Sequence, residues 1–94
     1  MTMALPELVL YGRDGCHLCD DARAIVQGLL EDRAARGLRA VAVRERDIAS
    51  DPALERQFLD RIPVLELGGR WLELAISTAR VRAFLDDALD GSLV

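Results

Sequence analysis

Short apolar runs alternate with amphipathic stretches along this chain. The first run, Glu7 to Tyr11, is apolar after its first residue and ends at Gly12, which predicts a buried strand followed by a tight loop. From Cys16 to about Arg36 the apolar residues recur with the spacing of one helix face, which predicts an amphipathic helix that ends at Gly37. Its predicted buried face consists of Leu18, Ala22, Ile25, Val26, Leu29 and Leu30.

Asp20 and Asp21 lie in the first turn of this predicted helix, and Arg33 and Arg36 lie in its last turn. This order of charges matches the helix dipole, which favours acidic groups at the start and basic groups at the end. We therefore expect these four side chains to stabilise the helix ends.

The next elements are a strand and a short helix. Residues Arg39 to Asp47 contain the run Ala40 to Val43, which is apolar on both faces and predicts a central strand with covering layers on each side. Asp51 and Pro52 then supply a cap and a first-turn proline for a short helix, which ends at Ile62–Pro63. Its predicted apolar positions are Leu54, Phe58 and Leu59.

The last third of the chain predicts a hairpin and a helix. Val64 to Leu67 and Arg70 to Leu74 flank Gly68–Gly69, a two-residue connection suited to a tight antiparallel turn. This register places Leu65 opposite Leu72 and Glu66 beside Trp71. Ser77 then caps a final helix, in which Ile76 and Val81 have the spacing of a hydrophobic staple. The buried stripe of that helix is predicted to contain Val81, Phe84, Leu85, Ala88 and Leu89.

The predicted order is strand, helix, strand, helix, strand, strand, helix. A strand pair joined through a long helix is parallel, whereas the final hairpin is antiparallel. We therefore expect a single α/β domain over residues 1–94, with a mixed four-stranded sheet and helices on both faces.

Composition narrows the classes of function. The net charge of −4 argues against a nucleic-acid partner, which requires a positive surface. The sequence shows neither a signal-peptide pattern nor a run of about 18 apolar residues, so we expect a cytoplasmic protein without a membrane partner. Only two cysteines are present, and they stand close together as Cys16-His17-Leu18-Cys19. In a cytosolic chain this spacing indicates redox or metal chemistry before a structural disulfide.

The cysteines lie at the junction of the first strand and the first helix. The positive end of a helix favours the thiolate, which is the form that attacks disulfides. Cys16 is therefore the expected nucleophile, and Cys19, one turn further on, is the expected resolving thiol. Arg13 and protonated His17 favour the Cys16 thiolate while the nearby aspartates oppose it, so we expect a reducing couple with a moderately lowered thiol pKa.

Two other interpretations of the pair stay open at this point. A Cys-x-x-Cys motif is half of a tetrahedral zinc site, although His17 is the only histidine available to complete it. Two inert buried cysteines are the second alternative, because cysteine is common in protein cores. By the same reasoning, His17 is a first-turn surface residue more readily than a catalytic base.

The sequence resembles the glutaredoxin branch of the thioredoxin fold, and in particular small glutaredoxin-like proteins that carry Cys-His-Leu-Cys. The likeness runs through Leu10 to Asp20, Asp47 to Pro52 and Arg61 to Leu65. It implies a thioredoxin-like fold and a cis peptide at Ile62–Pro63, facing the cysteines, where the residue before the proline offers its backbone to an extended substrate. Without the family, this proline is simply the end of a helix and the start of an edge strand.

The resemblance also implies a place for glutathione, with departures. Arg13 stands where glutaredoxins often carry a lysine that helps hold a glutathione carboxylate, which keeps the charge but changes its geometry. A second Gly-Gly is absent from Leu72 to Thr78, although Ser77 and Thr78 at a helix N-terminus can accept an anionic group. The motif also lacks the proline and tyrosine of dithiol glutaredoxins.

We therefore expect a monomeric thiol–disulfide oxidoreductase without a tightly bound cofactor. Cys16 and Cys19 are its expected catalytic residues, while Arg13, His17, Ile62 and Pro63 bind substrate. The expected partners are disulfide-containing proteins or small thiols, with glutathione as a co-substrate or a thioredoxin-reductase-type electron donor. Two alternatives are a metal or iron–sulfur binder, bridged between two chains with glutathione as extra ligands, and a redox-silent adaptor that uses the fold only to bind a partner.

Overall fold

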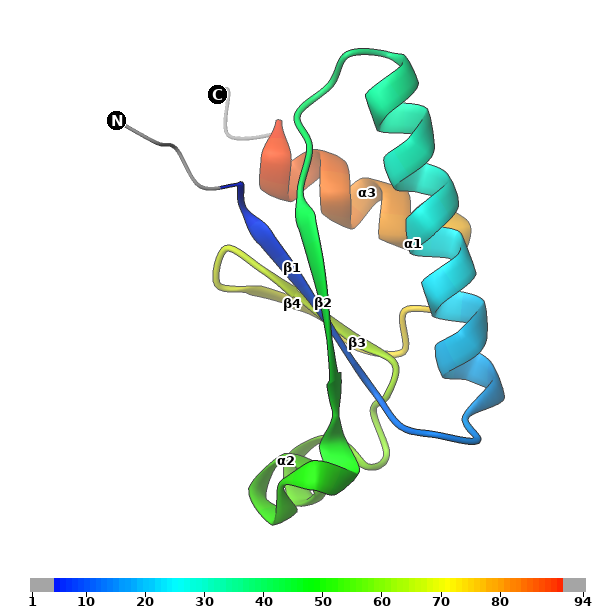
Figure 1. The fold of residues 1–94 in the computed structure, drawn as a ribbon, viewed down its shortest axis with the longest axis vertical. Helices are drawn as coiled ribbons and strands as arrows, with labels where there is room; N and C mark the ends of the chain where they lie inside the picture. The colour runs from blue at the N-terminus through cyan, green and yellow to red at the C-terminus, as the bar shows by residue number, and fades with distance from the viewer. Residues whose placement is uncertain (1–4, 91–94) are drawn as a thin grey trace.

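A computed structural model describes residues 5–90 of the chain. Four strands form one sheet in the order β2-β1-β3-β4, with three α-helices around it (Figure 1). The elements are β1 (Glu7–Gly12), α1 (His17–Ala35), β2 (Ala42–Asp47), the 3₁₀ turn η1 (Ile48–Ser50), α2 (Pro52–Phe58), β3 (Val64–Leu67), β4 (Arg70–Leu72) and α3 (Thr78–Leu89).

Strand pairing follows the predicted pattern. β1 is parallel to β2 and antiparallel to β3, and β3 and β4 form an antiparallel hairpin. The predicted register is confirmed, with Leu65 opposite Leu72 and Glu66 opposite Trp71. Gly68 and Gly69 connect the strands with φ angles of 57° and 79°. A tight hairpin turn requires such positive angles, which residues other than glycine rarely adopt.

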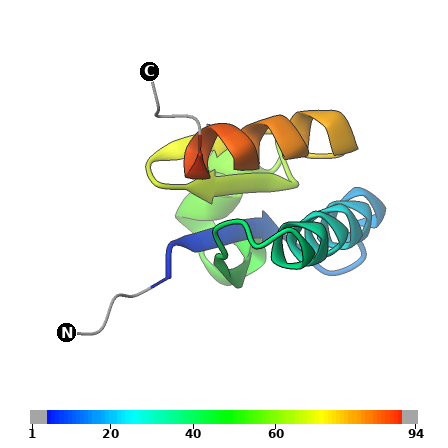
Figure 2. The ribbon, with the colours of Figure 1, turned by 90° about the horizontal axis from the view of Figure 1, so that it is seen from above.

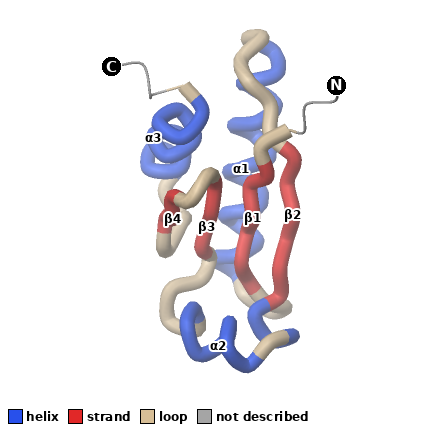
Figure 3. The backbone as a smooth tube through the Cα atoms, turned by 90° about the vertical axis from the view of Figure 1, so that its left-hand side faces the viewer, coloured by secondary structure: helices blue, strands red, loops and turns tan. Residues whose placement is uncertain are grey.

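The two faces of the sheet carry separate parts of the core. Helices α1 and α3 cover one face, whereas α2 lies at one end of the sheet (Figures 2 and 3). Alternate residues of β1 point to opposite faces: Leu8 and Leu10 pack with α1 and α3, while Val9 and Tyr11 pack with Phe58 of α2. The prediction of a mixed four-stranded sheet with helices is confirmed, and α2 reaches the second face at one end of the sheet through Phe58.

The prediction that Arg39 to Asp47 forms a central strand is wrong. β2 begins only at Ala42 and lies at the edge of the sheet, with no strand beyond it in the part of the chain that the structure describes. Val43 is consequently 47% exposed. The run Ala40 to Val43 is apolar, but half of it precedes the strand, so burial on both faces cannot be inferred from it.

Several side chains at element ends differ from the expected pattern. Leu18 and Leu59, predicted to be buried, are 43% and 44% exposed, and Ile76 of the predicted staple is also 43% exposed. The last strand ends at Leu72, two residues before its predicted end at Leu74. Within residues 5–90, no helix is long and apolar enough to cross a membrane.

Arg33 has a different role from the one expected at a helix end. Its side chain is buried and donates to Asp86 at 2.8 Å and to Asp90 at 2.9 and 3.0 Å, both on or next to α3. Its Nε also donates to the carbonyl of Arg39. Arg33 thereby joins α1, α3 and the loop before β2, and these hydrogen bonds hold the pKa of Asp90 below its usual value.

Candidate active site

The two cysteines lie at the start of α1 and form a disulfide. Cys16 is the N-cap of the helix, and its Sγ accepts a hydrogen bond from the backbone N–H of Cys19 at 3.1 Å. Their Cα atoms are 5.2 Å apart. When the disulfide is reduced, this N–H and the positive end of the helix both favour a thiolate at Cys16.

The two sulfurs differ in access to solvent. Cys16 is partly buried, whereas Cys19 is only 1% exposed. Both pack against the apolar cluster on the α2 side of the sheet, which includes Ile62 and Val64. An external disulfide can therefore approach Cys16 more readily than Cys19.

Ile62 and Pro63 lie beside this pair. The peptide bond between them is cis, and both side chains are buried. Ile62 belongs to the same cluster as Cys16 and Cys19, so the fold brings the proline segment and the cysteines together, as the family resemblance implies. The backbone N–H of Ile62 donates to the carbonyl of Phe58 at 3.0 Å. This N–H is therefore not free to donate to an extended substrate.

The segment before α3 pairs with the proline segment. Leu74 N–H donates to the Arg61 carbonyl at 3.0 Å, and Ala75 N–H donates to the Pro63 carbonyl at 2.9 Å. Leu74 has a φ of 48°, a left-handed conformation that favours glycine and costs a leucine backbone strain. The side chain of Ser77 caps α3 through the N–H of Arg80, so its hydroxyl is already engaged where an anionic group was expected to bind.

Arg13 and His17 are both exposed. Arg13 lies in the turn before Cys16, and His17 is the first residue of α1. Within residues 5–90 neither side chain forms an ion pair with a carboxylate. Both are therefore near Cys16 in the chain and open to solvent.

Gly12 is a residue of the site that the sequence analysis interpreted only as the end of a strand. A Cβ atom on Gly12 would lie 3.0 Å from the Sγ and 3.1 Å from the Cβ of Cys19. Such distances are shorter than ordinary van der Waals contact, so this position needs glycine to let Cys19 approach β1. The only signal in the sequence is a glycine directly after a buried strand and before the cysteine motif.

An aromatic cluster packs on the same side of the sheet as Ile62. The rings of Tyr11, Phe58 and Trp71 contact one another, with centroids 4.9 to 5.8 Å apart. The Tyr11 hydroxyl donates to Glu66 at 2.9 Å. Burial is the main cause that raises the pKa of Tyr11, and this hydrogen bond is the second. Trp71 is 47% exposed, so this cluster forms part of the surface next to the site.

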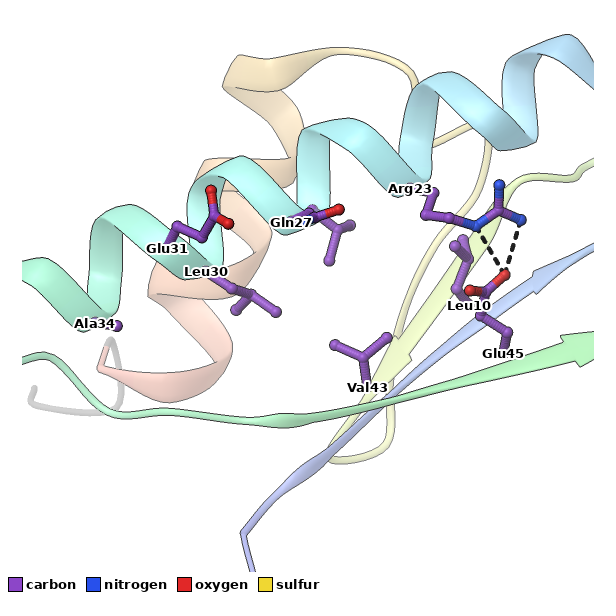
Figure 4. Close-up of a pocket in the computed structure, with 9 residues that line it drawn as sticks. Leu10, Arg23, Gln27, Leu30, Glu31, Ala34, Val43 and Glu45 are labelled. Carbon is purple, nitrogen blue, oxygen red and sulfur yellow. Dashed lines mark hydrogen bonds and ion pairs between the residues drawn. The ribbon is translucent and has the colours of Figure 1, made fainter.

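One concave surface, which neither cysteine lines, lies on the α1 side of the sheet. A groove of about 440 Å³ runs between α1 and β2, with Leu10 and Val43 among its apolar lining residues (Figure 4). Arg23 of α1 donates to Glu45 of β2 at 2.8 and 3.0 Å across one end of this groove (Figure 4). A smaller hollow of about 190 Å³ is lined by Cys19 and belongs to the site.

Metal binding finds little support in the arrangement of side chains. Among residues 5–90, no three histidine, cysteine or acidic side chains are grouped closely enough to hold a metal ion. A complete zinc site needs four ligands in most structural cases, so the cysteine pair alone supplies half of one.

Comparisons with known proteins agree with the fold. The model of the glutaredoxin-like domain family (DUF836) matches residues 7–86. The chain belongs to this glutaredoxin-like family. The match covers the candidate site, the cis-proline segment and most of α3, so the expected glutaredoxin-like membership is confirmed.

Two solved structures of similar chains extend the glutaredoxin-like comparison. A protein from X. campestris, target XcR50, is 39% identical, with a TM-score of 0.70 over 86% of this chain and 97% of its own. Protein Ne2328 from Nitrosomonas europaea is 25% identical, with a TM-score of 0.65 over 89% of this chain and 95% of its own. A search of curated proteins found no match. The family and the cysteine pair together fit a redox thiol function.

Proposed function

We propose that this protein is a thiol–disulfide oxidoreductase that uses Cys16 and Cys19 as its redox couple. In the reduced state, the Cys16 thiolate attacks a substrate disulfide, so that the substrate S–S bond breaks, one substrate sulfur leaves as a thiolate and the other forms a mixed disulfide with Cys16. Cys19 then loses its proton and attacks Cys16 as a thiolate, which closes the internal disulfide and releases the second substrate sulfur. Two electrons pass from the cysteine pair to the substrate in this exchange.

One observation carries the proposal: a partly exposed cysteine caps α1 while its partner is buried one turn further on. The exposed position suits a nucleophile, and the helix N-terminus favours its thiolate. The buried position suits a resolving thiol, which needs to reach only Cys16. An inert core pair would not place one sulfur at a solvent-accessible helix end.

Arg13, His17, Ile62 and Pro63 are the proposed substrate-binding residues. The carbonyl of Ile62 offers an acceptor to an extended substrate, and Arg13 and His17 supply exposed positive or titratable groups near Cys16. Disulfide-containing proteins and small thiols are the proposed substrates of a cytoplasmic monomer. Glutathione or a thioredoxin-reductase-type protein is the proposed electron donor, and a bound metal or cofactor is not required.

Trapping distinguishes the roles of the two cysteines. The Cys19→Ser variant is expected to accumulate a mixed disulfide on Cys16 when it is incubated with a disulfide substrate, because the resolving thiol is missing. The Cys16→Ser variant serves as the matched control and should trap little substrate. Intact-protein mass spectrometry measures both adducts, and a trap that forms on Cys19 instead would reverse the proposed roles.

A further inference from the structure

A small hollow lies beside the buried Cys19. It holds about 190 Å³, which is room for several water molecules at about 30 Å³ each. Cys19 is only 1% exposed, so this hollow is a route by which water can approach it. The hollow is lined by Leu10, Gly12, Arg13, Asp14, Cys19, Arg23, Glu45, Arg46 and Asp47.

The sheet register places Asp47 directly beside Gly12, the residue of β1 that Cys19 contacts. Gly12 and Asp47 are directly paired in the parallel β1–β2 ladder, so their Cα–Cβ directions lead to the same face of the sheet. On that face a Cβ atom at Gly12 would lie 3.0 Å from the Cys19 Sγ. Asp47 and Cys19 therefore both line the hollow on this face, on either side of the position where Gly12 lacks a side chain.

The other charged residues that line the hollow differ from Asp47, because each is already paired, lies on the opposite face of the sheet or belongs to an exposed turn. Glu45 accepts two hydrogen bonds from Arg23, which also pairs with Asp20. Arg46 pairs in register with Tyr11, so its side chain leads to the opposite face. Arg13 and Asp14 belong to the exposed turn before α1.

Asp47 itself retains a free acceptor. Its Oδ1 accepts the backbone N–H of Ala49 at 2.9 Å and so caps the 3₁₀ turn η1. Its other carboxylate oxygen has no hydrogen-bond donor within residues 5–90. That oxygen can accept a hydrogen bond from a water molecule in the hollow.

We infer that Asp47 is a positioning residue for proton transfer from Cys19, acting through water in the hollow beside Gly12. This inference rests on the proposed function and concerns its second step. Cys19 passes its proton through the water to the Asp47 carboxylate, and the resulting thiolate attacks the Sγ of Cys16. The bond between Cys16 and the substrate sulfur breaks, the substrate sulfur leaves as a thiolate, and Asp47 releases the proton to solvent.

The test measures the two exchange steps separately with a nitrothiobenzoate disulfide, whose thiolate product is coloured. One molecule of this disulfide per reduced protein releases a first thiolate when Cys16 attacks and a second when Cys19 resolves the mixed disulfide. The Asp47→Asn variant keeps a good capping side chain but removes the charged acceptor. Asp47→Ser is a second variant that keeps a capping side chain and removes the charge.

We expect both Asp47 variants to leave the first phase unchanged and to slow the second by at least about tenfold near pH 6, since general-base assistance contributes about 10²–10⁴-fold when complete. The difference from wild type should shrink as the pH rises above about 8.5, where a thiol ionises unaided. Asp51→Asn is the matched control, because Asp51 caps α2 through Ala53 in the same way. It should match wild type in both phases.

Two results would overturn the inference alone: an unchanged second phase in the Asp47 variants, or a faster one. A faster phase would show that Asp47 acts only through its negative charge, which disfavours the Cys19 thiolate. Absence of the first phase in wild-type protein would overturn the proposed function itself, and the inference with it.

Discussion

At the scale of single residues, the site depends on what is missing at Gly12 as much as on the two cysteines. The sulfur of Cys19 occupies the space that a side chain at this position would take. The sequence motif identifies the cysteines by their spacing alone. It does not reveal the roles of Gly12 and Asp47, because these arise from strand pairing and helix packing, which bring together residues from three separate segments.

A Gly12→Ala substitution tests this close approach. We expect the variant to be less stable by about 1 kcal/mol or more, because overpacking a well-packed region typically costs about 1–3 kcal/mol. Gly28→Ala is the matched control: nothing lies within 4 Å of its added Cβ, and it lies inside α1, where alanine is favoured by up to about 1 kcal/mol. Chemical denaturation measures both, and similar stabilisation of the two variants would refute the close approach.

At the scale of elements, local patterns predicted the four strands and three α-helices of residues 5–90. Apolar periodicity, capping residues and glycine pairs act over a few residues, so the sequence reports them directly. The position of β2 in the sheet depends on which strands pair with it, and a short apolar run such as Ala40 to Val43 carries no information about that. The exposure of Leu18 likewise follows from the tertiary position of the first turn of α1, which remains open around the cysteines.

Two matched truncations test the edge position of β2. Val43 is 47% exposed, whereas Val64 of β3 is fully buried. Val64→Ala should lower the free energy of unfolding by about 2 kcal/mol, because two buried methyl groups are lost and a cavity remains. Val43→Ala should cost less than about 1 kcal/mol. Equal losses in urea denaturation would indicate that β2 is covered in solution.

At the scale of the whole molecule, one buried arginine connects the two long helices. Arg33 joins α1 to α3 through Asp86 and Asp90, and to the segment before β2 through the Arg39 carbonyl. The sequence places Arg33 correctly in the last turn of its helix, but its burial and partners depend on contacts more than fifty residues away. Removing one partner of a buried ion pair is costly, because the other charge is left buried and unpaired.

This connection predicts a stability loss at acid pH. Hydrogen bonding by Arg33 lowers the pKa of Asp90 in the folded protein, so the folded state favours the ionised carboxylate more than the unfolded state does. The resulting stabilisation is fully present above the unfolded value of about 3.9 and is lost as the pH falls through the lowered folded value. The melting temperature of the wild-type protein should therefore fall steeply below about pH 4.

The Asp90→Asn variant should have a lower melting temperature than wild type at neutral pH and a shallower fall below about pH 4. Asp60→Asn is the control, because the exposed Asp60 forms no ion pair within residues 5–90. It should follow the wild-type curve. Parallel acid profiles for Asp90→Asn and wild type would contradict the role assigned to the Arg33–Asp90 contact.

The central claim is that Cys16 and Cys19 form a reversible redox couple. The most direct measurement is a redox titration of the purified protein in glutathione and dithiothreitol buffers, with thiol alkylation and mass spectrometry to count free cysteines. The account predicts one reversible two-electron transition at about −200 to −270 mV, the range of glutaredoxins and thioredoxin. Two cysteines that stay reduced throughout that range would contradict the claim.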